Sequence, residues 1–268
     1  MKKHVVLFTV FWALKTLSAF SQKVEIGLNV GLANYTGDLA PSVVLSETQP
    51  AAGVFARLNL NNTWALTGFA NFLRISGHDA NFSFNAPRNL SFRTDISEFA
   101  AVFEYNYFKY GTGVKDVHFT PYVYWGLGAA FYNPKAYYNG EWNELRPYQT
   151  EGSANAYSGV TAIMPMGIGI KWMPNKKMSL EWSIGGRKTY TDYLDDVSKT
   201  YIDANKQAQE RGLIAAVLAD PSSLKNEGAF VNKAGYQRGN PDFKDWYFNT
   251  NICISYRIFT RIKCARFY

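Results

Sequence analysis

The chain of 268 residues has a formal net charge of +7, and 47% of its residues are hydrophobic, 16% aromatic and only 18% charged. Without Lys2, Lys3 and Lys15, which lie in the N-terminal segment described next, the charge falls from +7 to +4, a balance that gives no case for nucleic-acid binding. Two cysteines, Cys253 and Cys264, are too few for a disulfide framework, although an exported chain can still pair them.

Residues 1–21 have the three parts of a secretory signal peptide. Lys2 and Lys3 precede an apolar run, residues 5–17, and Ala19-Phe20-Ser21 follows as a small-x-small cleavage site. An N-terminal membrane anchor is the weaker alternative because the apolar run is short and contains Lys15. Beyond residue 21 no run approaches 18 apolar residues, so the sequence predicts no membrane-spanning helix.

Eight segments have the composition of β-strands, and seven of them alternate apolar and polar residues. They cover residues 23–35, 51–59, 64–76, 95–107, 119–131, 164–172, 178–187 and 246–259. In the last segment Ile252 and Ile254 lie on one face, whereas Asn251 and Arg257 lie on the other. A strand of this length exceeds the five or six residues usual in soluble proteins and suits a tilted strand across a bilayer, which needs roughly 9–11 residues.

The connections between these segments alternate in length. Those after the second, fourth and sixth segments are short: residues 60–63, 108–117 and 173–177. Those after the first, third, fifth and seventh are long: residues 36–50, 77–94, 132–163 and 188–245. Outer-membrane barrels sort their connections in this way, whereas a soluble β-sandwich, which also alternates, has no reason to. The sequence therefore predicts an all-β fold over residues 22–259: an eight-stranded antiparallel transmembrane β-barrel with long outer loops, its last strand closing onto its first.

The polar faces of the predicted strands carry charges of both signs. We expect these side chains to form ion pairs inside the barrel, where eight strands leave an interior filled by side chains without a wide pore. They are Glu25, Arg57, Glu98, Glu104, Lys171, Glu181, Arg187 and Arg257.

The last long connection, residues 188–245, is predicted to contain a helix. Between Lys199 and Ala219 apolar residues recur at roughly helical spacing, and Asp220-Pro221 ends the pattern. Gly212 interrupts it.

The sequence contains little that indicates catalysis. His78 lies beside Asp79, and His118 is predicted at the opposite end of the barrel, so the two histidines cannot share a site. No serine-centred elbow and no spaced His/Cys set is present. We therefore expect no catalytic residue, no metal and no cofactor, with a site of Asp79 and His78 as the minor alternative.

An acidic group follows the seventh strand: Asp192, Asp195, Asp196 and Asp203. As a calcium loop it lacks the ligand spacing and the glycine of an EF-hand. As a helix N-terminus it is suitable, because Asp195 or Asp196 can cap the helix that follows. Since capping needs only one aspartate, we expect the others, with Tyr193 and Arg238, to form a surface for docking a partner.

Several short segments of the chain resemble the PorG family of the type IX secretion system. They are Thr191-Asp-Tyr-Leu-Asp-Asp-Val-Ser198, Arg238-Gly-Asn240, Asp245-Trp-Tyr247, Asn34-Tyr-x-Gly-Asp38, Asn133-Pro-Lys-Ala136, Trp142 with Leu145, and Thr150-Glu-Gly152. The resemblance covers nearly all of the chain after residue 21. It departs from the family in the length of residues 199–236 and in the tail after Phe259.

The resemblance implies a non-enzymatic barrel, exported by its signal peptide, that anchors or scaffolds the type IX protein secretion machinery in outer-membrane lipid. It implies a periplasmic ring of a PorK-like lipoprotein and a PorN-like protein as partners, and a connection to gliding motility in some members. The alternative is a free-standing, OmpA-like structural barrel or a lipid-modifying barrel enzyme.

The expected topology conflicts with docking through the acidic group. A periplasmic N-terminus places every long connection outside the membrane, so the segment of Asp192 would face away from a periplasmic ring. Either this segment serves an external partner, or the ring is contacted by Lys109 and Lys176 in the short turns and by Arg261 and Lys263 in the basic tail, residues 260–268.

Overall fold

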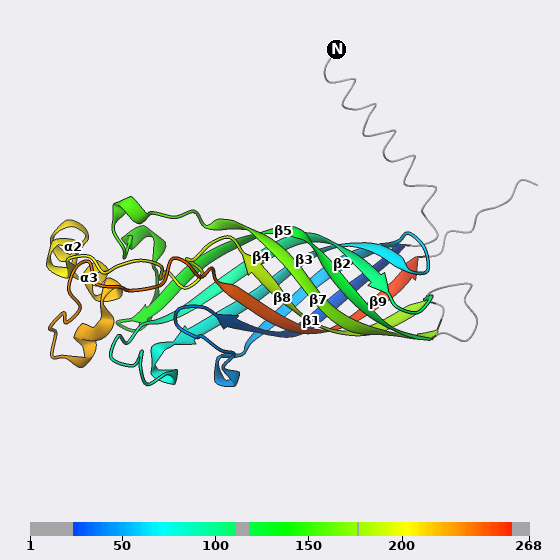
Figure 1. The fold of residues 1–268 in the computed structure, drawn as a ribbon, viewed down its shortest axis with the longest axis horizontal. Coiled ribbons are helices and arrows are strands. Elements are labelled where there is room, and N and C mark those ends of the chain that lie inside the picture. Colours follow the sequence, from blue (N-terminus) through cyan, green and yellow to red (C-terminus); the bar gives the residue numbers. More distant parts are fainter. Residues whose placement is uncertain (1–23, 111–117, 176, 259–268) are drawn as a thin grey trace, which may run out of the picture.

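The computed structural model describes residues 24–110, 118–175 and 177–258, and strands dominate it (Figure 1). The strands of these residues are β1 Val24–Thr36, β2 Gln49–Asn59, β3 Trp64–His78, β4 Ser91–Asn106, β5 Phe119–Tyr138, β6 Glu141–Glu144, β7 Val160–Asn175, β8 Met178–Thr189 and β9 Trp246–Ile258. The predicted signal peptide, the tail of residues 260–268, Lys176 and Cys264 lie outside the described residues.

Eight of the strands form a closed antiparallel barrel. They are hydrogen-bonded in the order β4-β3-β2-β1-β9-β8-β7-β5, and β4 also pairs with β5, which closes the ring. β1 pairs with β9 along its whole length, from Val24 opposite Ile258 to Thr36 opposite Trp246. The predicted eight-stranded barrel, with its last strand closing onto its first, is therefore confirmed.

Several strands extend further toward the long connections than predicted. β5 continues to Tyr138 and forms a hairpin with β6, which the sequence analysis did not anticipate. The turn residues Asn139 and Gly140 have φ angles of 54° and 86°, as a two-residue type I′ turn requires. The Asn-Gly pair signals such a hairpin, but Pro134 within the strand argues against it from sequence alone.

The outward face of the barrel is an apolar belt. Its larger side chains are 39–66% exposed: Ile26, Leu28, Val30, Leu32, Val54, Phe72, Phe99, Phe103, Val123, Trp125, Leu127, Ile168, Ile170, Trp182, Ile184, Ile252 and Ile254. At about 25 cal/mol for each Å² of apolar surface, this exposure is unfavourable in water and favourable in lipid. The belt therefore suits the barrel to span a membrane. No helix among the described residues is long and apolar enough to cross one.

The inward face of the barrel is polar and filled. Four carboxylates and four cationic side chains are buried there among the described residues, together with asparagine, serine and threonine side chains. A cavity of about 60 Å³ remains among them, which is room for a few water molecules.

The long connections fold together over one end of the barrel, and we call residues 37–48, 79–90, 139–159 and 190–245 the cap (Figure 1). The helical elements of the cap are η2 Leu45–Glu47, η3 Asp79–Asn81, η4 Arg146–Tyr148, η5 Ser153–Asn155, α2 Ala204–Arg211, α3 Leu213–Ala219 and η6 Pro221–Lys225. The predicted helical segment of the last connection is thus two helices, separated at Gly212 with φ +89°.

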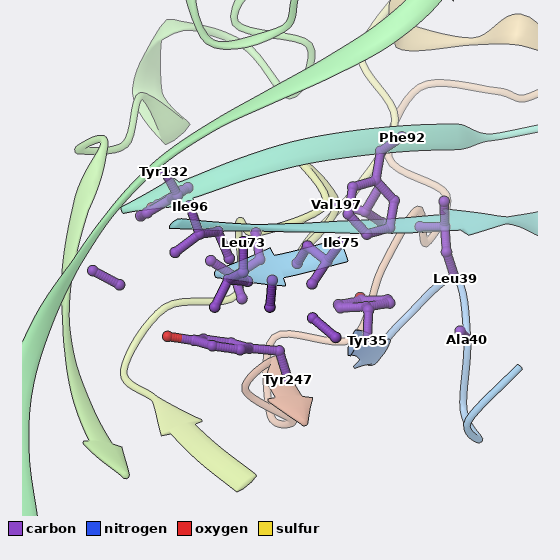
Figure 2. Close-up of a cluster of buried hydrophobic side chains, with 14 of the residues drawn as sticks. Tyr35, Leu39, Ala40, Leu73, Ile75, Phe92, Ile96, Tyr132, Val197 and Tyr247 are labelled. Atoms are coloured by element: carbon purple, nitrogen blue, oxygen red, sulfur yellow. The ribbon is translucent and has the colours of Figure 1, made fainter. Parts of the chain in front are cut away.

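A buried apolar cluster joins the cap to the barrel mouth (Figure 2). Tyr35 from β1 and Phe92 from β4 meet edge to face at 4.8 Å between ring centroids, and Val197 of the last connection belongs to the same cluster. This end of the barrel is therefore packed with side chains, and the cap has a core of its own.

Candidate functional site

Five of the seven segments that carry the resemblance meet at one place, the base of the cap. Residues 150–151, 195–196, 238 and 245 come from three different parts of the chain, and their side chains are all buried. We call Glu151, Asp192, Asp195, Asp196 and Asp245 the acidic cluster. Most of its carboxylates accept hydrogen bonds from loop backbone or hydroxyl groups, so the cluster organises the loops around it.

The first part of the cluster is a tyrosine between two carboxylates. The Tyr35 hydroxyl oxygen lies 2.6 Å from Asp195 Oδ2 and 2.9 Å from Asp245 Oδ1. Each carboxylate also accepts a backbone hydrogen bond of 2.9 Å, Asp195 from Val197 N and Asp245 from Leu194 N. Because a hydroxyl carries one hydrogen, it can donate to only one of the two carboxylates. The two short contacts therefore favour one retained proton on the Asp195–Asp245 pair.

The second part is centred on Arg238. Its guanidinium donates to Glu151 Oε1 at 3.2 Å, to Asp196 Oδ2 at 3.4 Å and to the Ala219 carbonyl at 3.2 Å. Asp196 also accepts hydrogen bonds from the hydroxyl groups of Thr150 and Tyr157, the latter at 2.6 Å. Arg238 thus ties the last connection to the one between β5 and β7.

Burial sets the protonation of these groups. Burial raises the pKa of Asp195 well above the usual range, and the nearby charges of Asp245 and Asp38 raise it further. Burial also raises the pKa of Asp245 well above the usual range, and the charges of Asp192 and Asp38 add to this rise. Burial also raises the pKa of Asp196 to about 6, although Arg238 opposes the shift. The cluster therefore exchanges protons at less acidic pH than ordinary aspartates do.

The docking expectation for this segment needs correction. Asp192, Asp195, Asp196 and Arg238 are each no more than 3% exposed, and Tyr193 is half-buried and stacks on Tyr157 at 4.5 Å. Four of the five side chains therefore cannot contact a partner while the cap is folded. The surplus of carboxylates suggested a surface, but a loop backbone amide and hydroxyl groups donate hydrogen bonds to Asp195 and Asp196 instead.

The capping expectation was also wrong about the residue. Asp203 is the cap of α2, with its side chain accepting hydrogen bonds from Asn205 N and Lys206 N at 2.9 and 3.1 Å. Asp195 accepts from Val197 N instead, and Asp196 has φ +67° in a turn. The helix begins later than the apolar spacing suggested, which moves its cap to the last aspartate of the group.

The eight charged residues expected in the lumen lie there in two groups. The larger contains Arg57, which pairs with Glu25 at 3.0 Å, Glu104 at 2.9 Å and Glu181 at 2.5 Å. Lys171 pairs with Glu104, and Arg257 pairs with Glu25 at 2.5 Å. In the smaller group Arg187 pairs with Glu98 at 3.2 Å.

The histidines do not form a site with Asp79. His78 Nδ1 lies 2.6 Å from Glu47 Oε1, whereas buried Asp79 pairs with Arg88 at 2.6 Å. His118 contacts the Met173 carbonyl near the short turns. Across residues 24–110, 118–175 and 177–258, no three acidic, histidine or cysteine side chains are placed to hold a metal ion.

The remaining docking candidates lie at the short turns. Lys109 is exposed beside the turn of residues 61–63, and Arg261 and Lys263, like Lys176, fall outside the described residues. Asn61 Oδ1 accepts hydrogen bonds from Thr63 N and Trp64 N, each 2.8 Å, which fixes this turn.

Sequence reasoning did not assign roles to Tyr35, Glu151 or Asp245, which complete the acidic cluster. The available signal was that each lies in a segment of the family resemblance. Nothing in the local sequence indicates that residues 35, 151 and 245 meet, because strand closure and loop folding bring them together.

The fold is similar to solved outer-membrane barrels. Ail of Yersinia pestis, solved with the heparin analogue sucrose octasulfate, has 10% identity and a TM-score of 0.43, covering 88% of this chain and 97% of that one. Neisserial surface protein A has 8% identity and a TM-score of 0.42, covering 87% and 96%. OprG of Pseudomonas aeruginosa has 10% identity and a TM-score of 0.41, covering 90% and 98%. These likenesses concern the fold alone.

No curated protein matches the sequence significantly. A family model described as "Domain of unknown function (DUF6089)" matches residues 3–210, which is most of the chain. The chain therefore belongs to the DUF6089 family, and it has the eight-stranded β-barrel fold of outer-membrane proteins.

Proposed function

We propose that the chain is a non-enzymatic outer-membrane barrel that anchors or scaffolds a type IX protein secretion machine. Its partners in this proposal are a PorK-like lipoprotein and a PorN-like ring protein, and its export uses the signal peptide of residues 1–21. The supporting observation is that five of the seven PorG-like segments, scattered between residues 34 and 247, meet in one buried cluster. A resemblance spread along the chain thus corresponds largely to one structural unit, the base of the cap.

The filled lumen is consistent with a scaffold. Its ion pairs cross the barrel from strand to strand, and the space between them is about 60 Å³, far smaller than a solute path. Because the cap also covers the barrel end that carries the long connections, the barrel suits a structural role better than a transport role.

The proposal assigns the ring contact to the periplasmic turns. Lys109 is exposed beside the fixed turn of residues 61–63, and Lys177 is exposed beside a turn that Asn175 fixes in the same way. In Asn175 the side-chain oxygen accepts hydrogen bonds from Lys177 N and Met178 N, each at 2.9 Å. Two rigid turns with exposed lysines form a surface to which an acidic partner can bind.

A deletion strain tests the function. Loss of type IX secretion, restored by the wild-type chain, is the expected result. Normal secretion in the deletion strain would contradict the proposal and favour a free-standing structural barrel, or a lipid-modifying one if the lipid composition changes.

Paired charge reversals test the docking face. We expect Lys109→Glu with Lys177→Glu to reduce co-purification of the ring and to reduce secretion, while the barrel level stays unchanged. The matched control is Lys206→Glu with Lys225→Glu, two exposed lysines of the cap. Equal loss of ring co-purification in both double variants would contradict a periplasmic docking face.

A further inference from the structure

A groove of about 1000 Å³ runs along one side of the cap and reaches the barrel wall. Its lining residues include Asp38, Phe84, Lys188, Phe243, Lys244 and Trp246. The lining residues come from the ends of β1 and β8, from the start of β9 and from the connections after β1, β3 and β8. The groove is thus assembled by the fold, not by one loop.

The groove begins at the outer edge of the apolar belt. On β1, β9 and β8 the last wholly lipid-facing row is Leu32, Thr250 and Ile184. Four residues further along the strands, Thr36, Trp246 and Lys188 lie side by side, and the row between contains Phe248. A tryptophan beside a lysine is the composition expected at the level of lipid headgroups. The lower end of the groove therefore lies at the height of the outer-leaflet headgroups.

Two exposed phenylalanines line the groove above this level. Phe243 is 73% exposed and Phe84 is 70% exposed, and no aromatic side chain of the described residues is more exposed than Phe243. The Phe84 ring meets that of Phe82 at 6.0 Å between centroids, but both phenylalanines leave most of their apolar surface exposed, which is unfavourable in water. Their faces suit the C–H groups of a sugar ring, which carry the partial positive charge that an aromatic face attracts.

Two lysines give the groove its positive charge. Lys188 is exposed, and Lys244 Nζ donates to the Pro241 carbonyl at 2.8 Å and attracts Asp192, which leaves two of its three ammonium hydrogens for another acceptor. The other basic residues near the outer edge of the apolar belt already have partners. Arg74 pairs with Asp95 at 2.6 Å, Lys135 lies 3.9 Å from Glu144, and Arg93 stacks over Trp142 at 3.9 Å.

The acidic lining residues do not neutralise these lysines by contact. Asp38 Oδ2 accepts a hydrogen bond from Asn240 N at 2.9 Å, and Asp242 is exposed without an ion pair among the described residues. Arg88, the third basic lining residue, is occupied by Asp79. The lysines of positions 188 and 244 are therefore the donors available for an anion.

We propose that this groove binds the phosphorylated headgroup of a glycolipid of the outer leaflet, with Lys188 and Lys244 contacting phosphate and Phe84 and Phe243 contacting sugar. Lysine ammonium groups bind phosphate as point charges, and a cleft of this size accommodates one or two sugar rings. The inference requires the outer-membrane placement of the barrel and does not depend on the secretion role.

Binding of defined lipids to the purified full chain in detergent tests this inference, with native mass spectrometry as the readout. The probes are bisphosphorylated lipid A, the same lipid A with both phosphates removed, and phosphatidylglycerol. We expect the bisphosphorylated form to bind at least about tenfold more tightly than the other two, equivalent to roughly 1.4 kcal/mol. Equal binding of the dephosphorylated form, or of phosphatidylglycerol, would overturn the assignment.

Variants separate the groove from the rest of the barrel surface. Lys188→Ala with Lys244→Ala should remove most of the preference for phosphate, and Phe84→Ser with Phe243→Ser should weaken binding of both lipid A forms. The matched controls are Lys206→Ala on α2 and Tyr107→Ser, which is 70% exposed at the short-turn end. All four proteins should keep the thermal midpoint of the wild type, since these side chains are exposed. Unchanged lipid binding in both groove variants would contradict the proposal.

Discussion

The lumen and the cap both bury charge, but they balance it differently. Among the described residues, the lumen buries Glu25, Glu98, Glu104 and Glu181 with Arg57, Lys171, Arg187 and Arg257. The buried charged residues of the cap and its base are Glu47, Asp79, Glu151, Asp192, Asp195, Asp196, Asp220 and Asp245, with Arg238 as the one buried cation of that part. The lumen thus buries four carboxylates with four cations, whereas the cap buries eight carboxylates with one cation, which pairs with only Glu151 and Asp196.

The difference follows from what each backbone offers. In a closed barrel every backbone amide is used by a neighbouring strand, so a buried carboxylate needs a cationic side chain as its partner. In loops many amides have no strand partner, and a carboxylate can accept from them directly. Asp195, Asp220 and Asp245 all do so. The lumen charges therefore cross-link strands, and the cap charges fix loop conformation.

The largest effect is expected from breaking the lumen group. Replacing Arg57 by alanine leaves Glu25, Glu104 and Glu181 without their shared cation, and we expect the free energy of unfolding to fall by about 3–5 kcal/mol. Urea unfolding in detergent measures this loss. The control is Arg74→Ala, which breaks the half-exposed pair with Asp95 and should cost less than about 1 kcal/mol. Equal losses in the two variants would contradict a structural role for the lumen charges.

The next effect is confined to the cap. Arg238→Met removes the cation shared by Glu151 and Asp196, and we expect faster hydrogen exchange and proteolysis within residues 190–245. The local cost should be about 3 kcal/mol, while the barrel strands keep their protection. Loss of protection in β1 to β4 as well would show that cap and barrel unfold together.

A third prediction compares the same substitution at two aspartates. Asp245→Asn supplies an amide hydrogen to the Tyr35 oxygen and removes the need for a retained proton, so we expect the cap to be unchanged or more stable at pH 7. Asp196→Asn replaces one carboxylate oxygen, which accepts a hydrogen bond from the Thr150 or Tyr157 hydroxyl, by an amide group that cannot accept, and we expect a loss of about 1–3 kcal/mol. Hydrogen exchange of the cap at pH 7 measures both. A greater loss in Asp245→Asn would contradict the shared proton.

The pH dependence of the cap has a defined sign. Because the folded cap holds the pKa of Asp195 and Asp245 well above the usual range, and that of Asp196 at about 6, protonation stabilises the fold. This stability is fully present below the ordinary aspartate pKa of about 3.9 and is lost as pH rises through 6 and beyond, by an amount on the order of 1–3 kcal/mol.

Proteolysis of residues 190–245 at pH values from 5 to 8 tests this sign. The wild-type cap should be cleaved faster as pH rises, and Asp245→Asn should show a flatter dependence. Faster cleavage at acid pH would contradict the prediction, and would indicate that the ion pairs of Arg238 dominate the cap.

The smallest effect concerns a single helix cap. Asp203→Ala removes the acceptor for Asn205 N and Lys206 N, and we expect α2 to lose about 1 kcal/mol without change elsewhere in the cap. Hydrogen exchange of Asn205 and Lys206 measures this loss. An effect as large as that of Arg238→Met would contradict the assignment of Asp203 as a helix cap.

The barrel was predictable from sequence because its pattern repeats. Alternation along the strand is enough to place Ile252 outward and Asn251 inward, and the alternation of short and long connections indicates the topology. The same alternation located all eight lumen charges, although which charges pair depends on strand stagger. Glu25 and Glu104, for instance, share Arg57 across β1, β2 and β4.

The acidic cluster was not predictable in the same way. Asp195 and Asp245 are fifty positions apart in a connection that contains α2 and α3, and no period relates them to each other or to Tyr35. A group of aspartates in a loop normally indicates an exposed surface, since carboxylates are seldom buried without cations. Here loop amides and a retained proton replace the cations, and that arrangement becomes visible only once the loops are folded.

Sidedness is the central claim, because it places the cap outside the cell and the short turns in the periplasm. Single cysteines at Lys199 and at Lys109, both exposed, test it in a background with Cys253 and Cys264 replaced by serine. A membrane-impermeant thiol reagent on intact cells should label the cysteine at position 199 and leave the one at position 109 unlabelled until the cells are opened. Labelling of position 109 with protection of position 199 would contradict the topology and the assignment of both faces.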